Sequence, residues 1–90
     1  MAVTDMDNLG THTIYINLLN EGSPCCRPTQ GIWVSEMTYR VLPTENYDPD
    51  DEHWEFPPGS VVECRQERRI IDGESIQITI AVRAIQPRAE

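Results

Sequence analysis

The chain contains no lysine, and its seven basic residues are all arginine. Fifteen acidic residues oppose them, so the formal net charge is −8 at neutral pH. A field of this sign repels phosphate, so we expect no nucleic-acid partner. It favours either a cationic partner or simple solubility. The arginines at 65–69 and at 83 are expected to pair across strands with Glu63, Glu67 and Glu74.

No apolar run is long enough to cross a membrane. The most apolar stretch, residues 76–85, is interrupted by Gln77, Thr79 and Arg83, whereas a membrane-spanning helix needs about 20 apolar residues. Residues 1–7 are acidic and lack an apolar core, so we expect no signal peptide. The sequence therefore predicts a cytoplasmic protein with no membrane partner.

The signatures of common catalytic and metal sites are also missing. There is no G-x-S-x-G, H-E-x-x-H, phosphate-binding glycine loop or dinucleotide fingerprint. The cysteines, Cys25, Cys26 and Cys64, lack zinc-site spacing, and adjacent cysteines rarely form a disulfide. The acids at 48–52 lack the glycine and the distant glutamate of a calcium loop. A Cys64–His53 pair would need the fold to bring the two together, so we expect no enzyme, catalytic residue, metal ligand or cofactor.

Alternation of apolar and polar residues predicts an all-β chain. Five runs have the pattern or composition of strands: 12–19, 30–35, 38–42, 61–70 and 74–84. Five short strands without an amphipathic helix favour a small SH3-like (Sm-like) partly open barrel. An OB-type barrel is the alternative, although it would normally include a helix and more residues.

The domain and its core follow from the same runs. We expect one domain over residues 12–85, between tails at 1–11 and 86–90. Val82 is predicted on the core face of its strand, and Trp33 on the outer face of its own. The expected core members are Ile16, Val34, Val41, Val62, Ile78 and Ile80.

Asp72-Gly73 lies between the last two runs and predicts a β-hairpin. A two-residue loop would pair Ile80 with Arg65 and mix charge into the core face. A three-residue loop, 71–73, would instead place Ile80 opposite Cys64. We therefore predict the three-residue loop, because a slip of one residue moves every side chain to the other face.

The long connection at 43–58 contains six acids and no arginine. Asp48-Pro49 followed by further acids is typical of a helix start, because aspartate caps and proline fits the first helical position. One short helical turn is therefore predicted at 49–54. Trp54 or Phe56 is expected to fold the loop over the mouth of the barrel.

These observations favour a non-enzymatic module that binds another protein with a basic surface. An acidic inhibitor or immunity-type protein that blocks a cationic, nucleic-acid-binding site is the alternative. A ligand-binding or catalytic barrel is a third and weaker one. The expected partner-binding residues are Trp33, Tyr47, Asp48, Asp50, Asp51, Glu52, His53 and Trp54.

One part of the chain also resembles a known family. Residues 47–52 read YDPDDE, and residues 54–64 read WEFPPGSVVEC. Together with INLLNEG at 16–22 and Arg27-Pro28, they resemble a family of small uncharacterised bacterial proteins. The similarity covers most of residues 12–84. It implies a compact intracellular bacterial domain, and it brings no activity, cofactor or catalytic residue with it.

Overall fold

The computed structural model describes residues 10–22 and 25–85 of the 90-residue chain. Within them, the five predicted strands are present, and a two-residue strand was not predicted. Most of the predicted tails, residues 1–9 and 86–90, lies outside the described residues. The elements are β1 (Thr11–Leu19), β2 (Cys26–Ser35), β3 (Thr38–Val41), β4 (His53–Trp54), β5 (Val61–Ile71) and β6 (Glu74–Ala84).

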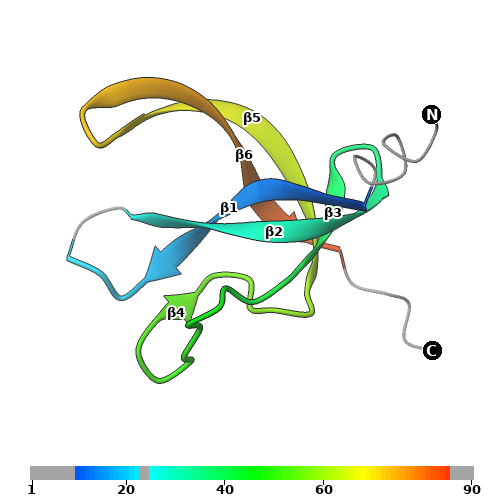
Figure 1. Ribbon diagram of the computed structural model, residues 1–90, viewed down its shortest axis with the longest axis horizontal. Helices are drawn as coiled ribbons and strands as arrows, with labels where there is room; N and C mark the ends of the chain where they lie inside the picture. Colours follow the sequence, from blue (N-terminus) through cyan, green and yellow to red (C-terminus); the bar gives the residue numbers. More distant parts are fainter. Residues whose placement is uncertain (1–9, 23–24, 86–90) are drawn as a thin grey trace.

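Five of these strands form a closed ring (Figure 1). β1 pairs with β2, β2 with β3, β3 with β5 and β5 with β6, and each of these pairings is antiparallel. Because strand direction alternates along this series, its first and last members run the same way. The pairing that closes the ring, Tyr15 with Ile80, is accordingly parallel. β4 lies outside the ring and pairs with the end of β1, where Trp54 is opposite Leu18.

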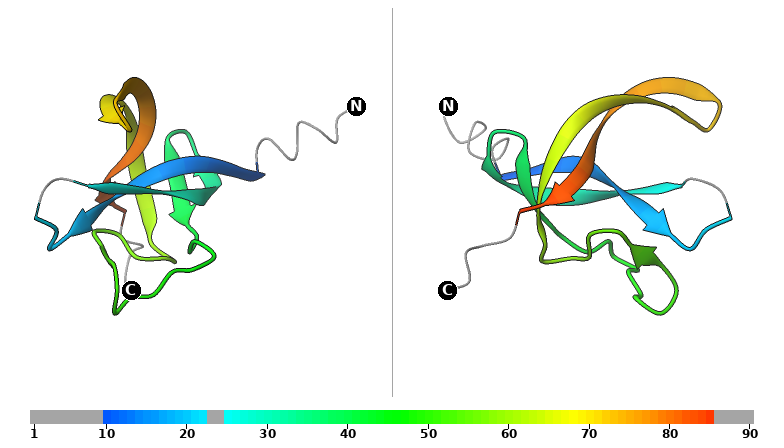
Figure 2. Two further views of the ribbon diagram at one scale, coloured as in Figure 1. Left: turned by 60° about the vertical axis from the view of Figure 1, so that its left-hand side comes forward. Right: turned by 180° about the vertical axis from the view of Figure 1, so that it is seen from behind.

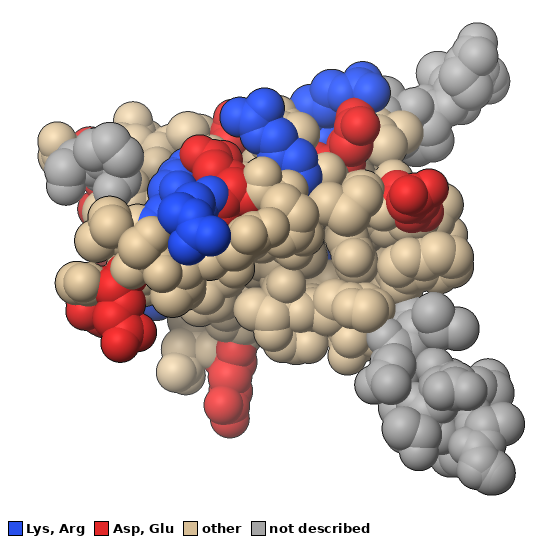
Figure 3. Space-filling model, turned by 90° about the horizontal axis from the view of Figure 1, so that it is seen from above, with Lys and Arg blue, Asp and Glu red and all other residues tan. Residues whose placement is uncertain are grey.

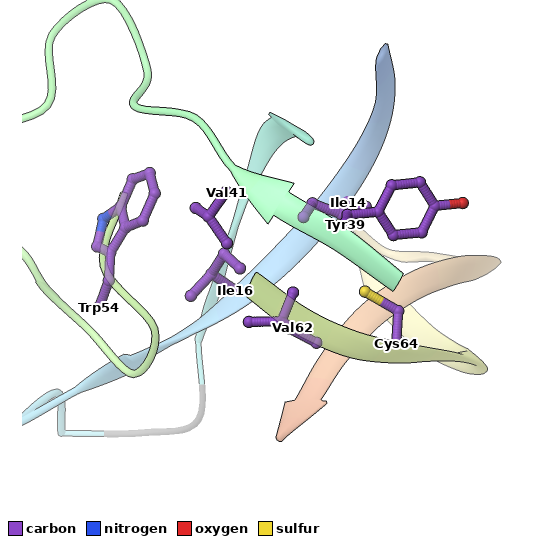
Figure 4. Close-up of a cluster of buried hydrophobic side chains, with 8 residues drawn as sticks. Ile14, Ile16, Tyr39, Val41, Trp54, Val62 and Cys64 are labelled. Atoms are coloured by element: carbon purple, nitrogen blue, oxygen red, sulfur yellow. The ribbon is translucent and has the colours of Figure 1, made fainter. Parts of the chain in front are cut away.

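The core fills the inside of the ring. Its main cluster consists of Ile14, Ile16, Tyr39, Val41, Trp54, Val62, Cys64 and Ala81. Trp54 stands at one end of this cluster and Tyr39 at the other (Figure 4). Ile16, Val41 and Val62 belong to this cluster, as predicted. Ile78 and Ile80 are buried too but are not members of it, so their predicted place in the same core is not confirmed.

The prediction for β2 is wrong, because its faces are reversed. Val34 is 47% exposed, and the buried residues of the strand are Thr29 and Gly31. A β-carbon at position 31 would lie 2.8 Å from Cδ1 of Ile14 and 3.0 Å from Cβ of Tyr39. Glycine is therefore needed where β2 passes over the core. The apolar residues that follow it, Ile32, Trp33 and Val34, are exposed.

The predicted register of the last hairpin is also wrong. The loop between β5 and β6 has two residues, so Ile80 pairs with Arg65 and Ile78 with Glu67. Asp72 and Gly73 have φ angles of 54° and 82°. A two-residue hairpin turn whose twist matches that of the strands needs positive φ angles at both of its central residues, and Asp72 and Gly73 meet this need.

A β-bulge reconciles this register with a buried core. Glu63 pairs with Arg83 but Cys64 pairs with Ala81, which leaves Val82 as the extra residue. Ala81 consequently faces the core opposite Cys64, whereas Val82 is 37% exposed, contrary to its predicted place on the core face. Alternation along β5 puts Arg65 on the face opposite Cys64, and Ile80, as its partner, lies on that same face.

The part of the hairpin beyond the bulge, residues 65–80, is here called the arm. It projects from the ring and curls over β1 and β2 (Figure 2). Arg69 reaches β2 from the arm, with Nη1 3.9 Å from Sγ of Cys26. No helix within the described residues is long and apolar enough to cross a membrane.

Candidate interaction site in the acidic loop

The acidic loop, residues 42–60, connects β3 to β5 and carries β4 on the side of the ring away from the arm (Figure 1). The carbonyl of Asp48 accepts hydrogen bonds from the N–H groups of Asp51 and Glu52, both at 2.9 Å. Oδ1 of Asp48 accepts another from the N–H of Asp50 at 2.9 Å. Asp48 therefore binds the backbone as a capping residue does. The segment nevertheless forms a turn followed by β4, and the predicted helical turn is not confirmed.

Three aromatic residues of the loop, Tyr47, Trp54 and Phe56, pack at one end of the ring. Trp54 is buried in the core, and its ring meets that of Tyr47 edge to face at a centroid distance of 4.7 Å. Phe56 is half-buried and packs against the same cluster. This agrees with the expectation that Trp54 or Phe56 folds the loop over the mouth of the ring. The apolar residues of the loop therefore fix its position, and its acids are left at the surface.

Glu52 ties the loop to β2. Its Oε1 accepts a hydrogen bond from Nε1 of Trp54 at 2.9 Å and one from Nε of Arg27 at 3.3 Å. Nη2 of Arg27 binds Oε2, which makes the pair bidentate. The bond from Arg27, and then the bond from Trp54, lower the pKa of the Glu52 carboxyl below its usual value. Glu52 is thus held charged and in place.

A hollow of about 500 Å³ lies between this loop and the start of β2. Four of its lining residues are acidic and one is basic, and the basic one is already paired with Glu52. No ion pair found among the described residues involves Glu45, Asp48 or Asp51. The lining residues are Arg27, Pro28, Thr44, Glu45, Asn46, Asp48, Asp51 and Glu52.

The structure brings most of the predicted partner-binding residues together, in different environments. Asp48, Asp50, Asp51 and His53 are exposed. Glu52 and Tyr47 are half-buried, and the burial of Trp54 leaves it little contact surface. Trp33 is 41% exposed on β2, on another part of the ring.

The predicted partner-binding residues did not include two charged lining residues of the hollow, Arg27 and Glu45. Arg27 stands 25 positions before its partner Glu52, and no local pattern marks such a distant pair. Glu45 was counted among the acids of the loop, but nothing in the sequence indicates that its side chain faces β2. Both assignments depend on how the loop folds back under the ring.

The arginines of β5 and β6 do not form a continuous basic surface. Glu67 lies 3.1 Å from Arg69 and 3.9 Å from Arg65 along the same strand. Arg83 binds its cross-strand neighbour Glu63 at 2.6 Å. Figure 3 shows arginines next to acids on the face that carries the hairpin. The predicted pairing across strands is confirmed at Glu63. At Glu67 the pairs run along the strand instead, and no ion pair found among the described residues involves Glu74.

The Cys64–His53 pair considered for catalysis does not form. Cys64 is buried in the core, at the end away from Trp54 (Figure 4), and His53 is exposed next to Trp54. Burial, and then the charge of Glu63, raise the pKa of the Cys64 thiol to about 11, so it stays protonated at neutral pH. Across residues 10–22 and 25–85, no group of three or more metal-ligating side chains is found.

Comparison with protein-family models, with curated proteins and with solved structures found no match. The resemblance to a family of small bacterial proteins therefore stays a prediction from the sequence.

Proposed function

We propose that this protein is a non-enzymatic interaction module, an SH3-like barrel whose acidic loop binds a basic surface of another protein. The observation that carries the proposal is the hollow beside β2, where Glu45, Asp48 and Asp51 have no ion-pair partner among the described residues. Carboxylates left without a cation inside the molecule are suited to receive one from outside. On the sequence resemblance alone, we propose the bacterial cytoplasm as the setting.

The chemistry of the hollow favours arginine or lysine side chains on the partner. A guanidinium group binds a carboxylate through two parallel hydrogen bonds, as Arg27 does with Glu52. Asp50, which is exposed and does not line the hollow, extends the negative surface beyond it. Such a surface mainly raises the rate of association, because steering by exposed charge acts before contact is made.

A second candidate uses the same surface for inhibition. A surface that offers several carboxylates to a cationic site resembles nucleic acid in charge, so the partner would be a nucleic-acid-binding protein that is blocked. The two candidates differ in one measurable property. An inhibitor removes its partner's nucleic-acid affinity when it binds, whereas an adaptor leaves that affinity intact.

The test compares two variants with the same change in net charge. The loop variant carries Glu45→Gln, Asp48→Asn and Asp51→Asn; asparagine at 48 keeps an oxygen that can accept from the turn. The control variant carries Glu36→Gln, Asp72→Asn and Glu74→Gln, all at exposed positions away from the hollow.

Both variants and the unchanged chain are immobilised and used to capture proteins from a bacterial lysate. We expect a protein that the unchanged chain and the control variant capture and the loop variant does not. Circular dichroism should show the same fold for all three. Equal capture by both variants, or equal loss in both, would contradict a role for the hollow.

A further inference from the structure

The outer edge of β6 lacks a strand partner along most of the arm. In the ring, β6 lies between β5 and β1, and β1 pairs with it only at Tyr15 and Ile80. From Glu74 to Ile78 this edge is therefore unpaired within the described residues. In both views of Figure 2, β5 is the only ribbon beside β6 near the tip of the arm. An unpaired edge of this kind can add a strand from another chain.

The register of the hairpin shows which backbone groups point outward at this edge. In a two-residue hairpin the residues that flank the loop, here Ile71 and Glu74, exchange hydrogen bonds. Bonded and non-bonded pairs then alternate along the ladder. The N–H and C=O groups of Glu74, Ile76 and Ile78 therefore point toward β5, and those of Ser75 and Gln77 point away from it.

The two edges of the arm differ in charge. Residues 65–69 of β5 include four charged side chains, whereas residues 75–82 of β6 include none. Charged side chains on an edge strand oppose pairing with another chain. Two copies joined along β5 and centred on Arg68 would place Arg68 opposite Arg68, with Glu67 opposite Arg69 on either side of it. From Ser75 to Val82, β6 is uncharged and rich in β-branched residues, and Glu74 is the one charged side chain of the unpaired segment.

We propose that this edge pairs with the same edge of a second copy, antiparallel and centred on Ile76. Ser75 of each copy would then be opposite Gln77 of the other, and the outward backbone groups of both residues would be satisfied. The two Ile76 side chains would lie opposite each other in a non-hydrogen-bonded pair, where side chains come closest. The result is a four-stranded sheet, with β6 next to β6, that buries the half-exposed Ile76.

The position of β1 favours this register. β1 occupies the edge of β6 at Ile80, so a second strand has room only up to about residue 78. A register centred on Ile76 pairs Glu74 with Ile78 and goes no further in that direction. A register centred on Gln77 would instead bring Ser75 against Thr79, next to the strand pair that closes the ring.

Salt should strengthen this association. Each copy carries a net charge of −8, so two copies repel each other at long range. The acidic loop lies on the side of the ring away from the arm (Figure 1). Its acids therefore gain no basic neighbour in the proposed dimer, and the repulsion between the two copies remains. Screening by salt lowers the repulsion without weakening a neutral strand pair. Salt should instead weaken the binding of a basic partner to the acidic loop. The two proposals therefore predict opposite effects of salt, and either can fail without the other.

The test uses proline at matched positions on the two edges. Gln77 and Arg68 are cross-strand neighbours whose N–H groups point to opposite edges of the arm. Proline at either position removes an outward N–H and no bond between β5 and β6. Sedimentation equilibrium between about 10 µM and 1 mM should give the dimer mass for the unchanged chain at the upper end, as expected of a small interface. Gln77→Pro should stay monomeric, and Arg68→Pro should behave as the unchanged chain does.

A cross-linking measurement covers the case in which both proline variants disturb the arm. Ile76→Cys, together with Cys25→Ser and Cys26→Ser, should form a disulfide-linked dimer under mild oxidation. Ser75→Cys in the same cysteine-free background at 25 and 26 should cross-link much less. In this register Ser75 of one copy is opposite Gln77 of the other, and not opposite Ser75. A monomer at all concentrations, a dimer unaffected by Gln77→Pro, or stronger cross-linking at position 75 than at 76 would overturn the proposal.

Discussion

The indole N–H of Trp54 donates a hydrogen bond to Glu52, with Nε1 2.9 Å from Oε1. The same carboxylate binds Arg27 at the start of β2. One acidic side chain thus connects a buried aromatic ring, the acidic loop and the rim of the ring of strands. Its neighbours at 45, 48 and 51 form no ion pair found among the described residues, and Asp48 binds only the backbone of its own turn.

Glu52→Gln should destabilise the protein slightly at neutral pH and not at low pH. The folded-state pKa of Glu52 is lowered, so its contribution is present above the unfolded value and is lost as the pH falls through the folded value. Because the Arg27 side chain is 44% exposed, we expect less than about 1 kcal/mol. Urea unfolding of both proteins at pH 7 and pH 3 measures the difference. A difference that grows at pH 3 would contradict this assignment.

Because of the β-bulge at Val82, truncating Ile78 and truncating Val82 should have different effects on the free energy of unfolding. Ile78→Ala should lower the free energy of unfolding by about 2–5 kcal/mol, because Ile78 is only 4% exposed. Val82→Ala should cost less than about 1 kcal/mol, because Val82 is the extra residue of the bulge and is partly exposed. Chemical denaturation of the two variants tests the register. Equal losses would favour a hairpin without the bulge.

Gly31→Ala should be destabilising although alanine has the higher strand propensity. The added methyl group would meet Cδ1 of Ile14 at 2.8 Å inside the packed ring. Overpacking of this kind costs about 1–3 kcal/mol. Gly22→Ala is the control, because no atom lies within 4 Å of an added β-carbon there. Thermal unfolding that places both variants at the same midpoint would show that β2 does not approach β1 so closely.

The sequence predicted the strands well because alternation is a local property. Glu74–Ala84 agrees with the predicted 74–84 at both ends. The errors arose where one residue changes the outcome. At Val82, a single inserted residue reverses the face of β6, and no pattern within the strand marks it. At Gly31, the strand puts a glycine toward the core, so its neighbouring apolar residues indicated the wrong face.

The sequence identified the acidic residues of the candidate site, but it predicted only part of their arrangement in space. The acids at 48–52 were recognised because they are clustered in the sequence, and the folding of Trp54 or Phe56 over the ring followed from the need to close its end. The pair between Arg27 and Glu52 was missed because it depends on the path of the loop beneath β2. The loop's acids therefore acquire their different roles only in the folded chain.

DNA and RNA should show no measurable binding at physiological salt. The net charge of −8 opposes approach to phosphate, and Arg69 and Arg83 are already paired with acids. A gel shift or fluorescence anisotropy titration with short single- and double-stranded probes measures this. Binding at micromolar protein with a steep dependence on salt would instead assign function to the arginines of the hairpin.

The association rate of a partner captured by the acidic loop tests the central claim most directly. It is measured against salt concentration for the unchanged chain, the loop variant and the control variant. The account predicts that the loop variant associates more slowly and that the control variant keeps the faster rate. The difference between them should shrink with added salt, as the screening length falls to about 8 Å at physiological ionic strength. Identical rates for the two variants at low salt would contradict it, because the hollow would then contribute no more than any other acids.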